Sequence, residues 1–352
     1  MSLKSFLQRK DIEFSFRRYG LDAMSAMAQG LFCTLLIGTI LNTVGTQFHI
    51  GVLTREIVNI AGKGYSIGSL AQAMAGPAMA VGIGAALKAP IMVLLTLAPV
   101  GFATNALGGA GGPFAVYAVA IIASEAGKAI SKETRIDLLA TPFVTLSIGI
   151  LAACLIASPI GKAASWLGNL IMWATELHPF LMGMLVAVLV GMALTLPISS
   201  AAICAGLGLT GLAGGAAVAG CCAQMVGFAV MSFKENGWGG FISQGIGTSM
   251  LQMGNILKNP RIWIPPTVTS MITGPVATCI FGLEMNGAAV NSGMGTCGLC
   301  GPIGVWTGWV SPTAFDWTGL ILVSFILPAA ICPALAFILR KINWIRPGDL
   351  KI

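Results

Sequence analysis

Six stretches of about 20 apolar residues run through the sequence, and each is long enough to cross the hydrocarbon core of a bilayer as a helix. They lie at 23–45, 66–88, 138–160, 179–197, 264–283 and 318–340. Only 9% of the residues are charged, whereas a soluble domain carries roughly 25% because its surface faces water. Most of the outer surface must therefore contact lipid. This pattern excludes a soluble enzyme and predicts an all-α polytopic membrane protein with about 8–10 transmembrane segments.

Glycine and proline interrupt three further apolar stretches, which are 89–130, 198–233 and 284–304. Non-helical backbone at membrane depth needs polar partners, so it occurs where protein buries it or a water-filled cavity contacts it. We therefore predict broken helices or re-entrant hairpins in these stretches. Amphipathic connectors, which mix apolar residues with charges and aromatic rings, are predicted at 46–63, 161–178 and 235–262.

Basic residues cluster at both ends of the chain. Five precede the first apolar stretch and four follow the last one; these are Lys4, Arg9, Lys10, Arg17, Arg18, Arg340, Lys341, Arg346 and Lys351. Because Lys and Arg concentrate on the cytoplasmic side of membrane spans, we predict that both termini are cytoplasmic. The predicted organisation is a cytoplasmic amphipathic segment at 1–20, one transmembrane domain at 21–342 and a cytoplasmic tail at 343–352. No basic stripe with interleaved aromatic residues is present, so no nucleic-acid partner is expected.

Five dipeptides recur in the same order along the chain; Gly76-Pro77, for example, recurs as Gly274-Pro275, and Gly112-Pro113 as Gly301-Pro302. With the predicted topology, the two halves of this repeat, about 21–190 and 191–342, are inverted relative to each other. Inverted repeats with paired broken helices are typical of transporters that bind substrate near the bilayer midplane. The pattern therefore predicts a carrier for a small polar solute.

Ionisable and amide side chains within an apolar chain are the candidates for solute binding, because they are costly in lipid. Glu284 begins a glycine-rich loop that also carries Asn286 and Asn291. A carboxylate and two amides supply the acceptors and donors that a polyhydroxylated solute requires. Asn105 occupies the corresponding loop of the first half. His49 is a candidate because histidine titrates near neutral pH.

Each candidate also has a structural interpretation. Glu284 would then cap a helix and face water, Asn105 would satisfy backbone groups at a kink, and His49 would be a solvated residue at the membrane surface. The pair Cys297 and Cys300 has the CxxC spacing, but no second pair or nearby histidine completes a metal site. We expect no metal, no cofactor and no catalytic residue, since motifs for nucleotide binding and hydrolysis are also missing.

The stretch 246–304, IGTSMLQMGNILKNPRIWIPPTVTSMITGPVATCIFGLEMNGAAVNSGMGTCGLCGPIG, resembles a known family. It is similar to the membrane-embedded EIIC component of the bacterial phosphotransferase system, in the branch of perfringolysin O regulator-like proteins. The resemblance extends over nearly the whole chain. It implies a homodimeric, multi-pass protein of the bacterial inner membrane, with re-entrant hairpins. Sugar-transporting relatives often carry Gly-Ile-Thr-Glu-Pro near the substrate, whereas this chain has Gly282-Leu283-Glu284-Met285.

Two functions stay open at this point. The first is a carrier for a small polar solute such as a sugar, with phosphate supplied by a separate IIB-type phosphocarrier. The second is a membrane-embedded regulator or sensor that binds a solute or a partner protein without sugar phosphorylation. The sequence contains no fused soluble IIA or IIB domain, so the chain is not expected to be an enzyme by itself.

Overall fold

The computed structural model of the protein describes residues 3–60 and 62–352. Residues 1 and 2 of the N-terminal segment and position 61 of the first connector lie outside the described part. The described chain is almost entirely helical, which confirms the all-α prediction. The helices are α1 (Leu3–Arg9), α2 (Ala23–Leu31), α3 (Ile37–Gln47), α4 (Gly51–Thr54), α5 (Ile67–Ala73), α6 (Ala75–Ala86), α7 (Ile91–Gly108), α8 (Gly112–Ile130), α9 (Asp137–Thr175), α10 (Pro179–Thr195), α11 (Ser200–Leu207), α12 (Gly211–Met231), α13 (Phe233–Ile242), α14 (Met253–Lys258), α15 (Ile264–Pro275), α16 (Cys300–Trp306), α17 (Ala314–Ile321) and α18 (Leu327–Lys341).

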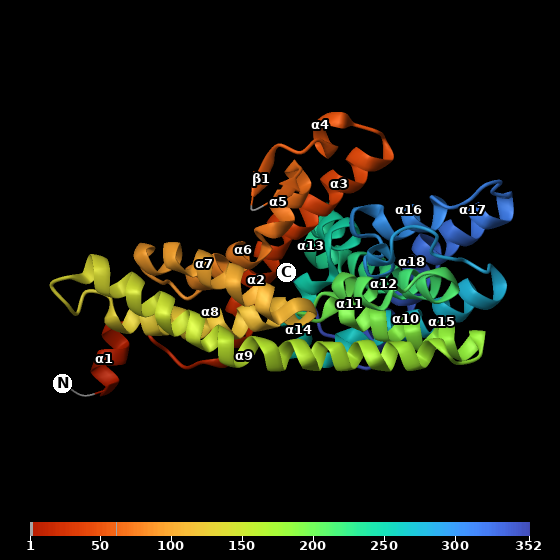
Figure 1. The fold of residues 1–352 in the computed structure, drawn as a ribbon. Coiled ribbons are helices and arrows are strands. Elements are labelled where there is room, and N and C mark those ends of the chain that lie inside the picture. The colour runs from red at the N-terminus through yellow and green to blue at the C-terminus, as the bar shows by residue number, and fades with distance from the viewer. Residues whose placement is uncertain (1–2, 61) are drawn as a thin grey trace. The chain divides into compact units, whose positions relative to one another are not determined.

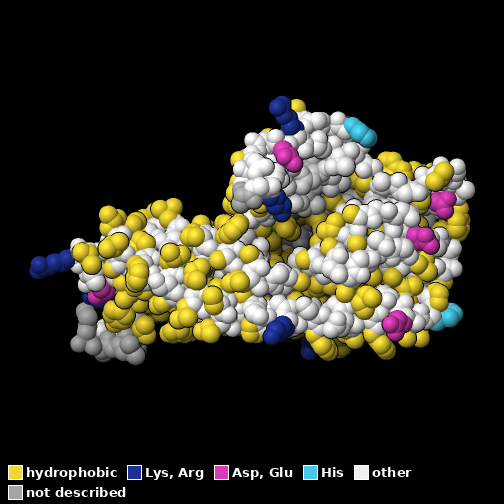
Figure 2. Space-filling view, in the orientation of Figure 1, with side chains coloured by type: hydrophobic (Ala, Val, Ile, Leu, Met, Phe, Trp, Pro, Cys, Tyr) yellow, Lys and Arg dark blue, Asp and Glu magenta, His cyan; other side chains and the backbone are white. Residues whose placement is uncertain are grey.

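Among the residues that the structure describes, five helical stretches are long and apolar enough to cross a membrane; these are Arg17–Gln47, Ile91–Ile130, Asp137–Thr175, Gly211–Met231 and Ala314–Lys341. The pair α5 and α6, bent by 51°, is a sixth. The stretch Ile91–Ile130 is folded at the 3₁₀ turn η3 (Gly109–Gly111) into two antiparallel helices, α7 and α8. Two further apolar helices in the described part of the chain, Pro179–Thr195 (α10) and Cys297–Trp306, are shorter. The total of about 8–10 transmembrane segments stays a prediction. Hydrophobic side chains cover much of the visible surface, and charged ones are few (Figure 2).

The chain forms two compact units, Met1–Ala163 and Ala164–Ile352, whose boundary lies inside α9. In the first unit, neighbouring helices approach closely because glycines face the adjacent backbone. A Cβ atom on Gly30 of α2 would lie 2.7 Å from the carbonyl oxygen of Ala78 in α6. A Cβ atom on Gly101 of α7 would lie 2.3 Å from the carbonyl oxygen of Gly76 in α6. Small residues at helix contacts are the usual means of close packing in membranes.

Two of the predicted connectors have a different structure. Within 46–63, the chain forms α4 and then a short antiparallel hairpin of β1 (Val58–Ile60) and β2 (Lys63–Tyr65), in which Val58 pairs with Tyr65. The β-branched residues of β1 favour a strand, and Gly62, at φ 82°, permits the tight turn. Most of the segment 161–178 is not a separate connector. The helix α9 continues through Pro159 without a break and ends only at Thr175.

The N-terminal segment belongs to the first unit, and within the amphipathic segment predicted for 1–20 the helix α1 ends at Arg9. The guanidinium of Arg18 donates two hydrogen bonds to the carboxylate of Asp11, at 3.1 and 2.8 Å. These bonds hold the pKa of Asp11 below its ordinary value. The same guanidinium donates to the carbonyl oxygen of Leu87, at 2.6 Å, so the segment is fastened to the loop between α6 and α7.

The core of the second unit is α12, in which every residue from Gly214 to Ala229 is buried. Small and apolar residues on all sides of a helix predict burial on all sides. It packs against α10, α15 and α18 (Figure 1). Between α10 and α12 the chain breaks after Thr195 and continues as the short helix α11. The predicted break is therefore confined to the first part of 198–233, because Gly211–Met231 is one continuous helix. A second break follows η4 (Ser243–Gly247), and η4 contacts η9 (Cys297–Leu299) in the glycine-rich stretch.

The C-terminal tail docks on the second unit through a row of amide side chains. The carbonyl oxygen of Leu350 accepts hydrogen bonds from Asn236 at 2.7 Å and from Gln252 at 2.9 Å. Asn255 donates to the carbonyl oxygen of Lys351, at 2.9 Å. The side chain of Leu350 is fully buried. The tail is therefore an integral part of this unit.

Replacing Leu350 by alanine is expected to loosen the tail selectively. The substitution removes buried apolar surface and should lower the free energy of tail docking by about 2 kcal/mol. The matched control is Ile352→Ala, whose side chain is 48% exposed. Carboxypeptidase should remove the C-terminal residues of Leu350→Ala much faster than those of Ile352→Ala. Equal digestion rates would show that the tail is not held by this contact.

Candidate functional site

The candidate residues of the second unit lie on an extended segment that crosses the beginning of α12. Gly282, at φ 56°, turns the chain out of the preceding helical turn. The backbone N–H of Met285 donates to the carbonyl oxygen of Gly211 at 2.8 Å, and the N–H of Gly211 donates to the carbonyl oxygen of Met285 at 2.9 Å. This reciprocal pair is one rung of an antiparallel ladder. It holds the segment beside the N-terminus of α12.

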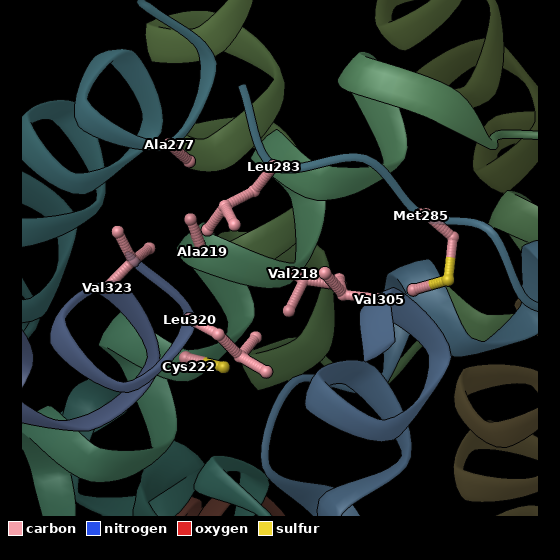
Figure 3. Close-up of a cluster of buried hydrophobic side chains, with 9 residues drawn as sticks. All are labelled: Val218, Ala219, Cys222, Ala277, Leu283, Met285, Val305, Leu320 and Val323. Carbon is pink, nitrogen blue, oxygen red and sulfur yellow. The ribbon is translucent and has the colours of Figure 1, made fainter. Parts of the chain in front are cut away.

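Side chains alternate in direction along this extended segment, as they do in a strand. Leu283 and Met285 are buried, and both point into an apolar cluster (Figure 3). Its other members are Val218, Ala219, Cys222, Ala277, Val305, Leu320 and Val323. Glu284 lies between the two buried residues and Asn286 follows them, and both are exposed. The alternation therefore places the carboxylate and the amide on the same outward face.

Two adjacent glycines of α12 make this arrangement possible. A Cβ atom on Gly215 would lie 1.8 Å from the carbonyl oxygen of Leu283, and one on Gly214 would lie 2.6 Å from the Cβ atom of Met285. Any side chain at either position would push the segment away from the helix. Close backbone approach is a common reason for glycine in such places.

Asn286 already has hydrogen-bond partners within the described part of the protein, whereas the carboxylate of Glu284 does not. The Asn286 Nδ2 group donates to the carbonyl oxygens of Glu284, at 3.2 Å, and Val305, at 3.1 Å. These bonds orient the amide and leave its Oδ1 atom available as an acceptor. The carboxylate of Glu284 has no hydrogen-bond or ion-pair partner among the described residues.

Asn291 lies farther along the same loop, in the 3₁₀ turn η8 (Ala289–Gly293), and is half-buried. The turn is fastened to the break around α11. Ser200 donates to the carbonyl oxygen of Gly293 at 2.8 Å, and Ser292 donates to the carbonyl oxygen of Leu209 at 2.6 Å. The structure thus brings Glu284, Asn286 and Asn291 into one loop that is anchored by backbone and serine contacts.

The two candidates of the first unit have different surroundings. Asn105, near the end of α7, is half-buried between two glycines; a Cβ atom on Gly112 would lie 2.4 Å from its Oδ1 atom. His49 follows α3, with φ 53°, and is exposed. A shared site that joins either residue with Glu284 stays a prediction.

Comparison with known proteins assigns the chain to a family. Residues 21–352 match the family described as Phosphotransferase system, EIIC. The chain belongs to this family. No curated protein and no solved structure matches it. Family membership makes it a membrane sugar-transport component of the phosphotransferase system, and it implies a sugar substrate and a separate IIB partner.

Sequence reasoning missed a buried polar network in this EIIC chain, beside the two breaks of the second unit. The Gln224 Oε1 atom accepts hydrogen bonds from Trp263 Nε1 at 3.0 Å and from the Thr195 hydroxyl at 3.3 Å. The hydroxyls of Thr195 and Ser249 lie 2.8 Å apart. Gln224 alone was recognisable, as a polar group within an apolar helix; the other residues come from segments far apart in the sequence. Such a network satisfies polar groups where helices break at membrane depth.

The cysteines of the EIIC chain are mainly packing residues. Cys297 and Cys300, which share the CxxC spacing, are both buried. Burial raises the free energy of a thiolate and so disfavours reactivity. Among the described residues, no group of three His, Cys, Asp or Glu side chains is placed to hold a metal ion.

Proposed function

We propose that the chain is a membrane carrier for a small polar solute, a sugar by family membership, and that the loop from Glu284 to Asn291 recognises this solute. The observation that carries the proposal is the exposed face formed by Glu284 and Asn286. It is held rigid because the alternate residues Leu283 and Met285 are buried. A recognition site works best when its polar groups sit on a backbone that is fixed by its own contacts.

The chemistry of this face suits a polyhydroxylated ligand. The Glu284 carboxylate accepts hydrogen bonds only, and sugar hydroxyls are donors as well as acceptors. Hydrogen bonds to an ionised acceptor are roughly twice as strong as neutral ones. The free Oδ1 atom of Asn286 adds a second acceptor, and the amide of Asn291 offers both a donor and an acceptor.

The distribution of Lys and Arg residues in the second unit supports a topology in which Glu284 and Asn286 face the outside and the C-terminus lies in the cytoplasm. All seven Lys and Arg residues of the unit follow the C-terminal end of α12 or lie near the tail; these are Lys234, Lys258, Arg261, Arg340, Lys341, Arg346 and Lys351. Arg340 donates to the carbonyl oxygen of Met231, at the end of α12 opposite to Gly211 and Met285. The positive-inside rule then puts Glu284 toward the outside. In this orientation, a solute from outside meets Glu284 first. We extend the proposal to a bacterial inner membrane, two cytoplasmic termini and a homodimer.

A thermal-shift experiment on the detergent-purified protein tests the proposal. The melting temperature is measured with sugars, sugar acids and polyols, since a ligand that binds only the folded state raises it by mass action. Replacing Glu284 by glutamine removes a charge-assisted acceptor and should weaken binding of the stabilising solute by about 10–100-fold. The matched control is Glu176→Gln, which neutralises another exposed carboxylate of the same unit.

The outcomes separate the two functions. A sugar that stabilises the wild type and Glu176→Gln, but not Glu284→Gln, supports the carrier and its site. Equal affinity in both variants would remove Glu284 from the site. If no solute stabilises the protein, the carrier loses its support, and a regulator that recognises a protein partner becomes the better explanation.

A further inference from the structure

A basic pocket lies at one end of the first unit, and the proposed solute site does not use it. Its volume is about 270 Å³, which is small compared with sites for drug-sized ligands. The pocket is lined by Arg9, Lys10, Lys88, Pro90, Lys128, Ser131, Lys132 and Glu133. Five of these residues are cations and one is an anion, so the lining has a clear surplus of positive charge.

Internal pairing leaves two of the cations free. Arg9 and Lys10 both contact the carboxylate of Glu133, and Lys128 pairs with Glu125 at 3.0 Å. Lys88 and Lys132 are exposed, and their ammonium groups have no ion-pair or hydrogen-bond partner among the described residues.

The backbone at both free lysines has an unusual conformation that directs them to the same end of the unit. Lys88 follows α6 with φ 56°, and Lys132 follows α8 with φ 61°. A positive φ is uncommon for a residue with a side chain. Because α6 and α8 both end here, the two turns bring one unpaired lysine each to the rim of the pocket.

The surroundings of the pocket are those of a membrane surface. Ile91, directly after the lining residue Pro90, is 64% exposed, and Leu138 and Leu139, at the start of α9, are 77% and 70% exposed. Large exposed apolar side chains on a helix that is long enough to span a bilayer are expected to face acyl chains. The basic residues are thus flanked by the helix faces that would contact lipid.

We propose that this pocket binds a phosphate group, with the phosphodiester headgroup of an anionic membrane lipid as its ligand. Compact lysine ammonium groups bind phosphate oxygens as point charges. Basic pockets between membrane helices on the cytoplasmic side bind anionic headgroups. Free inorganic phosphate presents the same chemistry and is the alternative source.

The test compares lipid binding by the full-length protein and two double variants. Mixed micelles that contain phosphatidylglycerol or phosphatidylcholine are titrated into the purified protein, and the melting temperature reports binding. The variant Lys88→Gln/Lys132→Gln removes both unpaired cations from the rim. The variant Arg55→Gln/Lys63→Gln is the control, because it removes the same amount of charge from exposed positions outside the pocket. These positions lie in the connector between α3 and α5, before the N-terminal end of α5 and α6, whereas the pocket follows the C-terminal end of α6.

We expect phosphatidylglycerol to stabilise the wild type more than phosphatidylcholine does. Each lysine near an anionic surface contributes roughly 1 kcal/mol, so the rim variant should bind phosphatidylglycerol about thirtyfold more weakly, while the control variant keeps the wild-type affinity. Inorganic phosphate, titrated alone, distinguishes the sources. Stabilisation at submillimolar phosphate without a lipid preference would support the phosphate site and assign it to a free anion.

Two results would overturn the proposal. One is an unchanged lipid and phosphate response in the rim variant, because the pocket would then not be the binding site. The other is a rim variant that loses affinity only for a IIB partner protein. In that case the basic residues form a protein-docking surface.

Discussion

Replacing Gly220 by alanine is expected to lower the free energy of unfolding of the second unit by about 3 kcal/mol. A Cβ atom at this position would lie 1.9 Å from the carbonyl oxygen of Ala187 and 2.6 Å from its Cα atom. These atoms belong to the backbone of α10, so no side-chain rotation can make room. The helices α10 and α12 would have to separate, and the buried core around α12 would lose its packing.

The control for Gly220→Ala is Gly206→Ala in α11, where a Cβ atom would meet nothing within 4 Å. Alanine stabilises an open helical position by up to about 1 kcal/mol relative to glycine, so the control should be neutral or slightly stabilising. Thermal unfolding in detergent, followed by tryptophan fluorescence, measures both variants. The expected fall in melting temperature for Gly220→Ala is roughly 10 °C. A variant as stable as the wild type would contradict the close contact of α10 and α12.

Replacing Lys128 by methionine should destabilise the first unit by about 3–5 kcal/mol. The side chain is only 2% exposed, and its ammonium group donates to the carbonyl oxygen of Asp11 at 2.6 Å as well as pairing with Glu125. Methionine keeps the apolar stem but leaves the largely buried carboxylate of Glu125 without its cation. The carbonyl oxygen of Leu87, which Lys128 also contacts, would keep its bond from Arg18.

A double-mutant comparison separates the ion pair from packing. The variant Glu125→Gln/Lys128→Met removes both charges and should recover a large part of the lost stability, because no uncompensated charge remains buried. The exposed neighbour Lys132→Met is the control and should change stability by less than about 0.5 kcal/mol. If Lys128→Met is as stable as Lys132→Met, the burial of this ion pair is refuted.

The ion pair of Glu125 and Lys128 can be predicted from the sequence, but its burial cannot. The spacing of Glu125 and Lys128 predicts an ion pair within one helix, and the structure confirms the pair at 3.0 Å. The spacing alone does not reveal that the side chain of Lys128 is buried. The N-terminal segment, through the backbone of Asp11, covers Lys128, and no local pattern reveals a contact between residues so distant in sequence.

The candidate site shows the same division. Its residues could be identified from the sequence because Glu284, Asn286 and Asn291 are polar groups in a glycine-rich break of an apolar chain. The geometry of these residues could not be predicted from the sequence, because it depends on the backbone hydrogen bonds between Gly211 and Met285. That pair decides that Leu283 and Met285 point inward and Glu284 and Asn286 outward. A shift of one residue in its register would reverse all four directions.

Hydropathy and charge along the chain were enough to predict the membrane environment, the helical class, the glycine-rich break at 284–304 and the ends at which the cations gather. These properties follow from hydropathy and charge, which act along short segments and need no knowledge of neighbours. The docking of the tail by Gln252, the burial of Lys128 and the exposed face of Glu284 become visible only in the folded chain. Each depends on hydrogen bonds or close packing between segments far apart in the chain, and such contacts exist only once the helices have assembled.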